Sequence, residues 1–323
     1  MRRVLLIALL LPALAIAAPL TEFPLDDAVP GGVAVVALPQ TGKTAPHAEY
    51  SGQHVMTVRH GGHWYALVGL SLDTVPGPKT LDVNVPGASD IHIGFTVMPK
   101  EYPSQSVTIA DPQMVDPTPE QLKRIDEEQQ HLSKVMAKFH DVPAPHISFI
   151  WPAPGPESSP FGYHRIFNGE PRSPHSGIDI AAPEGTPVKA PAAGWVADVG
   201  SYYFCGNTLT IDLGQGLYSV YCHLSRIDVK KGQWLKRGQR VGRIGATGRA
   251  SGPNLHWTVR LNEVPVDPHV FLGNNAPTPP PTTPPPAVTM AAPANTTAAS
   301  AATVRAPASV TTAAPAATTK PNH

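Results

Sequence analysis

The chain has 323 residues with 24 basic and 24 acidic side chains, so its formal net charge is zero. A chain without a basic excess lacks the electrostatic footprint of a nucleic-acid-binding protein, and we expect no nucleic-acid partner. Without the terminal segments treated below, roughly 250 residues remain, which is enough for two domains with their own cores.

The first 17 residues have the order of a secretory signal peptide. Arg2 and Arg3 precede the apolar run Val4–Leu11, and Ala15-Ile16-Ala17 supplies an A-x-A cleavage pattern. This apolar run is shorter than the about 20 residues that a membrane-spanning helix needs. We therefore predict that residues 1–17 are a signal peptide and that the protein acts outside the cytoplasm. An uncleaved membrane anchor is the alternative.

Short runs of β-forming residues, separated by Pro, Gly and Asp, occupy residues 28–112. These runs are VAVVAL, HVMTVR, HWYALVGLSL, TLDVNV, DIHIGFTV and SVTIA. The pattern predicts a small all-β domain over residues 18–112. The histidines of this region have no ligand spacing, and we expect structural or solvated roles for His47, His54, His60, His63 and His92.

A helix and linker are predicted over residues 113–147. Thr118 is placed as an N-cap, followed by Pro119 at the first helical position and by Gln121 three residues after the cap. Apolar residues then recur at spacings of three, four or seven: Leu122, Ile125, Leu132, Met136 and Phe139. We expect this stripe to pack on a neighbouring domain rather than to bind a ligand.

Two short segments about 80 residues apart carry a possible metal-ligand set. SPHSGIDIAAP contains His175 and Asp179, and SGPNLHW contains His256. Two imidazoles and one carboxylate suit a tetrahedral Zn²⁺ with one open position for water. We place His175 and Asp179 on one strand, where side chains four apart share a face, and Asn254 beside His256 on another.

A third segment, YSVYCHLS, puts His223 near the end of a further predicted strand, after the turn-like Gly214–Gly216. The chain has 14 histidines, and any one of them alone is more often a core or surface residue. The joint pattern of these segments favours a shared site.

With these blocks in this order, residues of about 150 to 273 resemble the catalytic domain of the lysostaphin/LytM-type zinc metallopeptidases, which cut peptide cross-links in bacterial cell walls. The resemblance implies a mainly β fold of the duplicated-hybrid-motif type over residues 148–273. It also implies zinc ligation by His175, Asp179 and His256, with His223 as a catalytic histidine. The implied activity is that of a zinc metalloendopeptidase acting on the peptide stems of peptidoglycan.

The N-terminal region resembles the accessory domain that precedes the catalytic domain in some Gram-negative members of that family. The resemblance rests on PGGVAVVAL, on the F-x-V-x-x-x-x-Y-x-x-Q run from Phe95 to Gln105, and on the helix that follows. It implies a periplasmic location and allows this domain to cover the active site within the same chain. We expect a monomer.

Asn254 stands where the family has a second catalytic histidine. An amide is neutral and has no useful basicity, although it can donate a hydrogen bond to a developing oxyanion. Slow turnover, an adapted active site, and a catalytically inactive wall-binding or amidase-activating module all remain open. Retention of all three ligand positions favours the enzyme.

Two cysteines, Cys205 and Cys222, flank a hairpin centred near Gln215. That hairpin places Cys222 opposite about residue 208, so a bridge to Cys205 is expected to be strained or absent. Alternation along the strand predicts that Cys222 faces the packed side of the sheet when His223 faces the site.

From about residue 274 the composition changes to Pro, Thr and Ala. Such a segment cannot bury enough apolar surface to offset its chain entropy, so residues 274–323 are predicted to be a disordered spacer.

Overall fold

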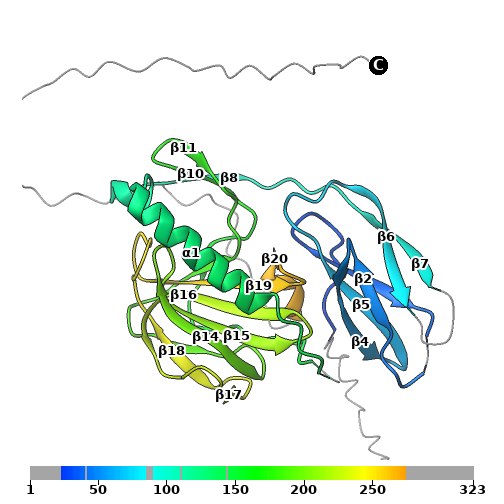
Figure 1. Cartoon of the computed structure of the whole chain (residues 1–323). Coiled ribbons are helices and arrows are strands. Elements are labelled where there is room, and N and C mark those ends of the chain that lie inside the picture. The colour runs from blue at the N-terminus through cyan, green and yellow to red at the C-terminus, as the bar shows by residue number, and fades with distance from the viewer. Residues whose placement is uncertain (1–22, 41, 85–89, 110, 143–144, 274–323) are drawn as a thin grey trace, which may run out of the picture. The chain divides into compact units, whose positions relative to one another are not determined.

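A computed structural model describes residues 23–40, 42–84, 90–109, 111–142 and 145–273. The predicted signal peptide and the predicted C-terminal spacer lie outside these residues. The described chain is mainly β, as predicted, with one long helix, α1 (Pro119–Met136) (Figure 1). None of its helices is long and apolar enough to cross a membrane.

The N-terminal region forms two antiparallel sheets, with strand orders β1-β5-β4 and β3-β2-β6-β7. The strands are β1 (Val33–Leu38), β2 (His47–Tyr50), β3 (Gln53–His54), β4 (Met56–His60), β5 (His63–Gly69), β6 (Gly77–Asn84) and β7 (Ile91–Val97). Alternating apolar side chains of β1, such as Ala34 and Val36, join Trp64 and Leu81 in one buried core. The all-β prediction for these strands is confirmed.

The last predicted strand of this region has a different partner. β8 (Ser104–Val107) pairs in parallel with β10 (His164–Phe167), and β11 (Glu170–Arg172) pairs with the other edge of β10. A local pattern of β-forming residues predicts a strand but not the strand it pairs with. The chain after β7 therefore adds to the C-terminal region before the helix begins.

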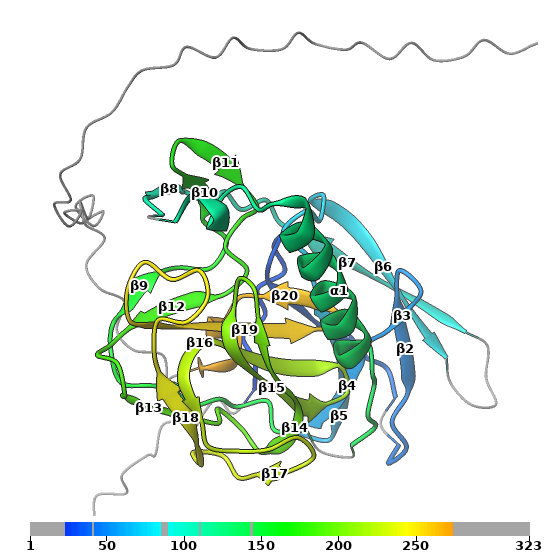
Figure 2. The same ribbon diagram turned by 60° about the vertical axis from the view of Figure 1, so that its left-hand side comes forward.

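The C-terminal region contains a ten-stranded sheet with the main order β17-β14-β15-β16-β19-β12-β9 (Figure 2). Its strands are β9 (Glu157–Ser159), β12 (Ile178–Ala181), β13 (Pro187–Lys189), β14 (Gly194–Tyr202), β15 (Gly206–Gly214), β16 (Leu217–Ile227), β17 (Trp234–Leu235), β18 (Arg240–Ile244), β19 (Asn254–Leu261) and β20 (Val264–Val266). The turn between β15 and β16 has positive φ angles at Gly214 and Gly216, which glycine adopts without strain. The strands β12, β16 and β19, predicted to carry site residues, are neighbours in this sheet.

Helix α1 packs on the central strands of this sheet. Thr118 and Gln121 form the predicted capping box, and Pro119 occupies the first turn. Val135 and Met136 are buried against Tyr218, Val220 and Cys222 of β16. The predicted apolar stripe is thus confirmed at the C-terminal end of the helix. It is wrong at Leu122, which is 53% exposed, although Ile125 of the same stripe is buried.

Two turn residues tie the N-terminal strands to the C-terminal sheet. The Gln215 side chain accepts from Thr57 N–H (2.9 Å), and the Asn262 side chain accepts from Gly69 N–H (3.0 Å). Gly69 approaches the sheet so closely that a Cβ there would lie 2.4 Å from the Leu261 carbonyl oxygen. These contacts satisfy buried backbone donors that would otherwise lose their water without compensation.

Replacement of Asn262 by Ala should destabilise the fold, because it leaves the buried Gly69 N–H without an acceptor. The expected loss in the free energy of unfolding is about 1–3 kcal/mol, measured by urea denaturation. Asn168→Ala is a matched control: Asn168 has φ 52° against 50° for Asn262, but its bond to Ile109 N–H is exposed to water. Equal losses in the two variants would contradict the proposed role of the buried bond.

Candidate metal centre

Three side-chain atoms predicted as metal ligands converge on one point. His175 Nε2 lies 3.1 Å from Asp179 Oδ1 and 3.0 Å from His256 Nδ1, and the last two atoms are 2.9 Å apart. Four ligand atoms at 2.0–2.1 Å from a tetrahedral zinc ion would lie about 3.3–3.4 Å from one another. The three donors are therefore nearly at the separation that such an ion requires.

The sheet register explains how two of these residues meet. Asp179 on β12 is directly opposite His256 on β19 in an antiparallel pair. Gly177 precedes this pair, and a Cβ at that position would lie 2.5 Å from the Trp257 carbonyl oxygen. A side chain at this position would thus force the two strands apart.

His175 does not lie on the strand, contrary to the prediction. It precedes β12 by three residues and is held in a loop, where its N–H donates to Tyr163 O (2.9 Å) and its carbonyl accepts from Gly162 N–H (2.8 Å). The shared strand face used in the prediction is therefore not what brings His175 and Asp179 together. The loop turns the imidazole toward Asp179, which side-chain alternation cannot reveal.

Hydrogen bonds orient both imidazoles. His175 Nδ1 lies 2.8 Å from Pro160 O, an atom that can only accept, so Nδ1 carries the proton and Nε2 presents a lone pair. His256 Nε2 lies 2.9 Å from Thr258 Oγ1, which leaves Nδ1 directed at the other two donors. Such bonds to the second ring nitrogen are typical of histidines that bind metals.

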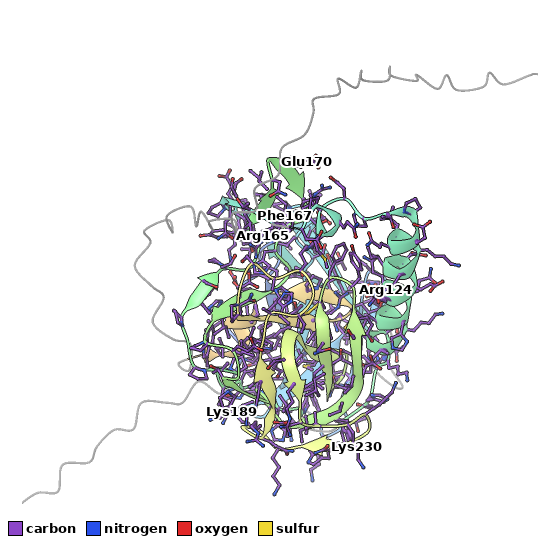
Figure 3. The ribbon with its side chains drawn as sticks, turned by 90° about the vertical axis from the view of Figure 1, so that its left-hand side faces the viewer. Arg124, Arg165, Phe167, Glu170, Lys189 and Lys230 are labelled. Atoms are coloured by element: carbon purple, nitrogen blue, oxygen red, sulfur yellow. A yellow bond between two sulfur atoms is a disulfide. The ribbon has the colours of Figure 1, made fainter. Side chains whose placement is uncertain are left out.

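The second oxygen of Asp179 is held by Arg165, which the sequence analysis did not single out. Arg165 Nη2 donates to Asp179 Oδ2 (2.8 Å), and Arg165 Nη1 donates to Gln105 Oε1 (2.9 Å). Ser159 Oγ also donates to Gln105 Oε1 (2.7 Å). Arg165 lies on β10 near Phe167 (Figure 3), and Gln105 is its register partner on β8.

Electrostatics favour, at Asp179 and His175, the protonation states that a cation needs. Burial raises the pKa of Asp179, but His175 and His256 outweigh it and hold this pKa well below its ordinary value. Burial lowers the pKa of His175, so its imidazole is neutral. A carboxylate and a neutral imidazole lone pair thus face the same point, which fits a divalent cation of the zinc type.

His223 lies beside this cluster on β16 and is only 9% exposed. Its ring centroid is 6.1 Å from that of His256, and its Nδ1 lies 2.7 Å from Thr247 O. Because a carbonyl only accepts, the proton is on Nδ1 and Nε2 is a free base. Burial, followed by the influence of His256, lowers the pKa of His223 to about 4.

The backbone of His223 is held by a disulfide that the sequence analysis did not expect. Cys205 and Cys222 are bonded, with their Cα atoms 4.7 Å apart. The hairpin pairs Leu209 with Tyr221 as predicted, but a bulge follows, and Cys205 O accepts from His223 N–H (2.7 Å). Cys205 lies in the turn that precedes β15 and next to Cys222, so the predicted absence of a bridge, which assumed that strand register alone sets the distance, was wrong.

Asn254 lies at the first position of β19, two residues before His256 on the same strand. Its Nδ2 donates to Gly252 O (2.8 Å). Its Oδ1 is buried and accepts no hydrogen bond from the residues that the structure describes. The side chain thus presents a free acceptor, whereas the sequence analysis considered it as a donor.

Known proteins resemble this chain over both of its regions. The model of peptidase family M23 matches residues 173–268, and that of the peptidase family M23 N-terminal domain matches residues 26–100. A crystal structure of a Pseudomonas aeruginosa protein assigned to peptidase M23 is 43% identical, with a TM-score of 0.65 over 76% of this chain and 95% of that chain. The chain belongs to peptidase family M23. The resemblance seen in the sequence is thereby confirmed.

Curated relatives match a shorter part of this M23 chain. The DD-carboxypeptidase/endopeptidase Mpg of Neisseria meningitidis serogroup B is 42% identical over 113 residues, 34% of this chain and 26% of that protein. The peptidoglycan DD-endopeptidase ShyB of Vibrio cholerae serotype O1 is 45% identical over 94 residues, 29% of this chain and 22% of that protein. The chain thus spans about a quarter of the length of these relatives.

The segment between the two M23 matches reaches the metal centre of this peptidase. Two carbonyl groups of the short helix η1 (Pro112–Met114) accept hydrogen bonds from the C-terminal region. Gln113 O accepts from Tyr203 Oη (3.0 Å), and Met114 O accepts from Arg249 Nη1 (3.2 Å). Gln105 from the same segment contacts Arg165. That this region covers the site within the chain stays a prediction.

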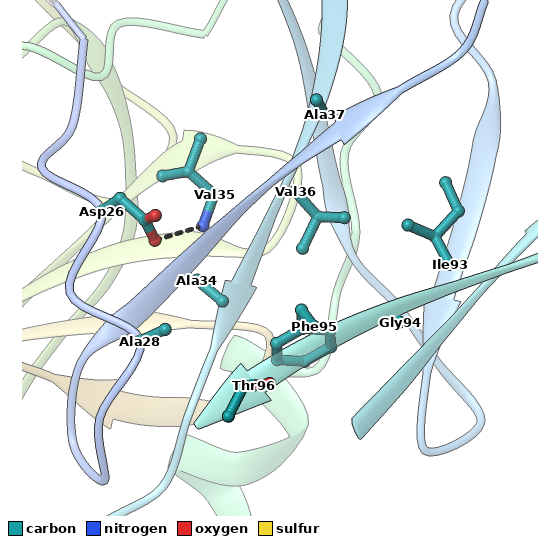
Figure 4. Close-up of a pocket in the computed structure, with 10 residues that line it drawn as sticks. All are labelled: Asp26, Ala28, Ala34, Val35, Val36, Ala37, Ile93, Gly94, Phe95 and Thr96. Atoms are coloured by element: carbon teal, nitrogen blue, oxygen red, sulfur yellow. Dashed lines mark hydrogen bonds between the residues drawn. The ribbon is translucent and has the colours of Figure 1, made fainter. Parts of the chain in front are cut away.

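A cavity of about 340 Å³ lies elsewhere in the M23 chain, between β1 and β7 (Figure 4). Small or apolar side chains line most of it, and Asp26 accepts there from Val35 N–H (3.0 Å). None of its lining residues belongs to the metal centre. This cavity is therefore separate from the histidine cluster.

The environment of His223 predicts an unusual titration in the metal-free protein. ¹⁵N NMR of the imidazole should show the Nδ1–H tautomer at pH 7 and protonation only near pH 4, because burial disfavours the charged ring. The unfolded imidazole titrates near 6.5, so this difference should lower stability as pH falls from about 6.5 to about 4. A midpoint near 6.5 in the folded protein would contradict the buried environment.

Proposed function

We propose that this protein is a zinc-dependent endopeptidase that hydrolyses peptide cross-links of peptidoglycan. The observation that carries the proposal is the convergence of His175 Nε2, Asp179 Oδ1 and His256 Nδ1 in a chain of peptidase family M23. The substrate class comes from two relatives, the DD-carboxypeptidase/endopeptidase Mpg and the peptidoglycan DD-endopeptidase ShyB.

His175, Asp179 and His256 would hold the zinc ion, with one coordination position left for substrate or water. When bound, zinc supplies Lewis-acid polarisation of the scissile carbonyl and lowers the pKa of water. Arg165 holds Asp179 Oδ2 and so leaves Oδ1 facing the two imidazoles. The Pro160 and Thr258 contacts fix the two rings in the same way.

His223 is proposed to move the proton. Its Nδ1–H is engaged by Thr247 O, so its Nε2 is the atom that takes a proton from the attacking water and gives it to the leaving amine. Burial keeps this ring neutral at neutral pH, which is the state that accepts a proton. The Cys205–Cys222 bridge and the bond from His223 N–H to Cys205 O hold the base in place.

Asn254 is proposed to hold a polar hydrogen of the substrate or of the attacking water. The buried Oδ1 has no donor among the described residues, and an unsatisfied acceptor of this kind is stabilised by any N–H or O–H that reaches it. Unlike a histidine, this amide cannot take the proton away. A periplasmic location and coverage of the site by the N-terminal region are part of the same proposal.

The direct test is chromatography of muropeptides after incubation of sacculi with the purified, zinc-loaded full chain. The proposal predicts loss of cross-linked muropeptides and about one zinc ion per chain. Asp179→Ala removes one of three donors, so both zinc content and cleavage should fall strongly. Zinc content equal to that of the parent would refute the ligand assignment. Zinc retention and sacculus binding without any cleavage would instead favour the wall-binding module.

Asn254→His tests whether the asparagine weakens the site. A second base beside the zinc ion should raise turnover by about tenfold or more, which corresponds to about 1.4 kcal/mol of barrier. Zinc content should not change, since Asn254 is not among the three converging donors. Asn254→Gln serves as the amide control. Slower turnover with histidine would mean that the asparagine is an adapted part of the site.

A further inference from the structure

Arg249 lies next to the metal centre with its charge uncompensated. It follows Thr247, the acceptor for His223 Nδ1, by two residues, and its backbone N–H donates to Phe204 O (2.8 Å). No carboxylate of the described residues lies within ion-pair distance of its guanidinium, which makes one hydrogen bond, to Met114 O. An unpaired, partly buried charge is costly, so a position of this kind calls for a functional explanation.

Two neighbouring arginines, unlike Arg249, are paired with carboxylates. Arg165 is paired with Asp179 (2.8 Å), and Arg172 is paired with Asp116 (3.0 Å) and with Glu170 (2.6 Å). Burial, followed by the repulsion of Arg172 and Arg165, lowers the pKa of Arg249 to about 10, which still leaves it charged at neutral pH. Of these three arginines, Arg249 is thus the one without a carboxylate partner among the described residues, and it could bind an anion that reaches it.

Two aromatic rings hold the guanidinium in a defined plane. Arg249 Cζ lies 4.0 Å from the centroid of Phe204 and 4.9 Å from that of Phe167. Stacking uses the faces of a guanidinium, whereas its N–H groups point outward in the plane. One N–H is engaged by Met114 O, so most of the donor edge stays available for a planar, bidentate partner.

We infer that Arg249 binds a carboxylate of the peptide substrate and so determines which end of a peptide stem enters the site. This inference rests on the proposed function, because it is that function which brings a peptide carboxylate to this position. A charged carboxylate accepts more strongly than a neutral carbonyl oxygen, so it would compete well against Met114 O for the guanidinium. The carboxylate belongs either to the C-terminus of the stem or to one of its acidic side chains.

The test measures binding rather than cleavage. Zinc-loaded full chain is titrated calorimetrically with a monomeric stem peptide that has no cross-link to cut, in three forms: unmodified, amidated at the C-terminus, or amidated at the side-chain carboxylate. We expect one amidation to weaken binding about tenfold or more, and its position identifies the carboxylate. In Arg249→Gln the three forms should bind equally.

Two further variants make the test specific. Arg249→Lys keeps the positive charge and the aliphatic part of the side chain on the two rings, but it loses the planar guanidinium. This variant should therefore remain folded and discriminate less than the parent among the three peptides. Arg237→Gln removes the same charge from an exposed residue that follows β17, which lies at the opposite end from β10 (Figure 2), and should behave as the parent.

Equal binding of all three peptides by the parent would overturn the inference, as would unchanged discrimination in both Arg249 variants. Loss of discrimination at Arg249 in a protein that cuts no muropeptide would support this inference while refuting the proposed endopeptidase activity. The binding and cleavage measurements therefore distinguish failure of the Arg249 inference from failure of the proposed endopeptidase activity.

Discussion

The geometry of the metal centre depends on one carboxylate. Asp179 Oδ1 lies within 3.1 Å of a nitrogen from each of two imidazoles, while Asp179 Oδ2 is held by Arg165. Each contact comes from a different part of the chain: the loop before β12, the neighbouring strand β19, and strand β10. Because Arg165 holds Oδ2, the carboxylate cannot rotate freely, and Oδ1 stays at the point that the two rings face.

Arg165 also links the centre to the segment that follows the N-terminal sheets. Its partner Gln105 is on β8, which pairs with β10 rather than with the strands that precede it in sequence. The same segment continues to Met114, whose carbonyl reaches Arg249. Residues far outside the peptidase match at 173–268 thus contribute to the surroundings of the proposed ligands. Through Arg165, this segment is thus one hydrogen-bonded residue away from a proposed ligand.

A second constraint acts on His223. This residue has a φ of 64°, a left-handed conformation that non-glycine residues adopt only when their surroundings enforce it. The enforcing contacts are the bond from its N–H to Cys205 O, the disulfide at Cys222 and the bond from Nδ1 to Thr247 O. Together they aim a buried, neutral imidazole at the cluster. Strain of this kind is typical of functional positions.

The sequence by itself determined which residues could form the site and most of the strands that carry them. Metal-ligating residue types stand out in any chain, and alternation predicted β1 and β19 because it reports directly on burial of one strand face. The capping box of α1 was equally local, since Thr118 and Gln121 are three residues apart. The tertiary structure alone decided the partner of β8, the loop that aims His175, the turn that places Cys205 next to Cys222, and the absence of a carboxylate partner for Arg249 among the described residues. Each of these depends on contacts between residues distant in sequence, and a local pattern of polar and apolar side chains holds no information about such contacts.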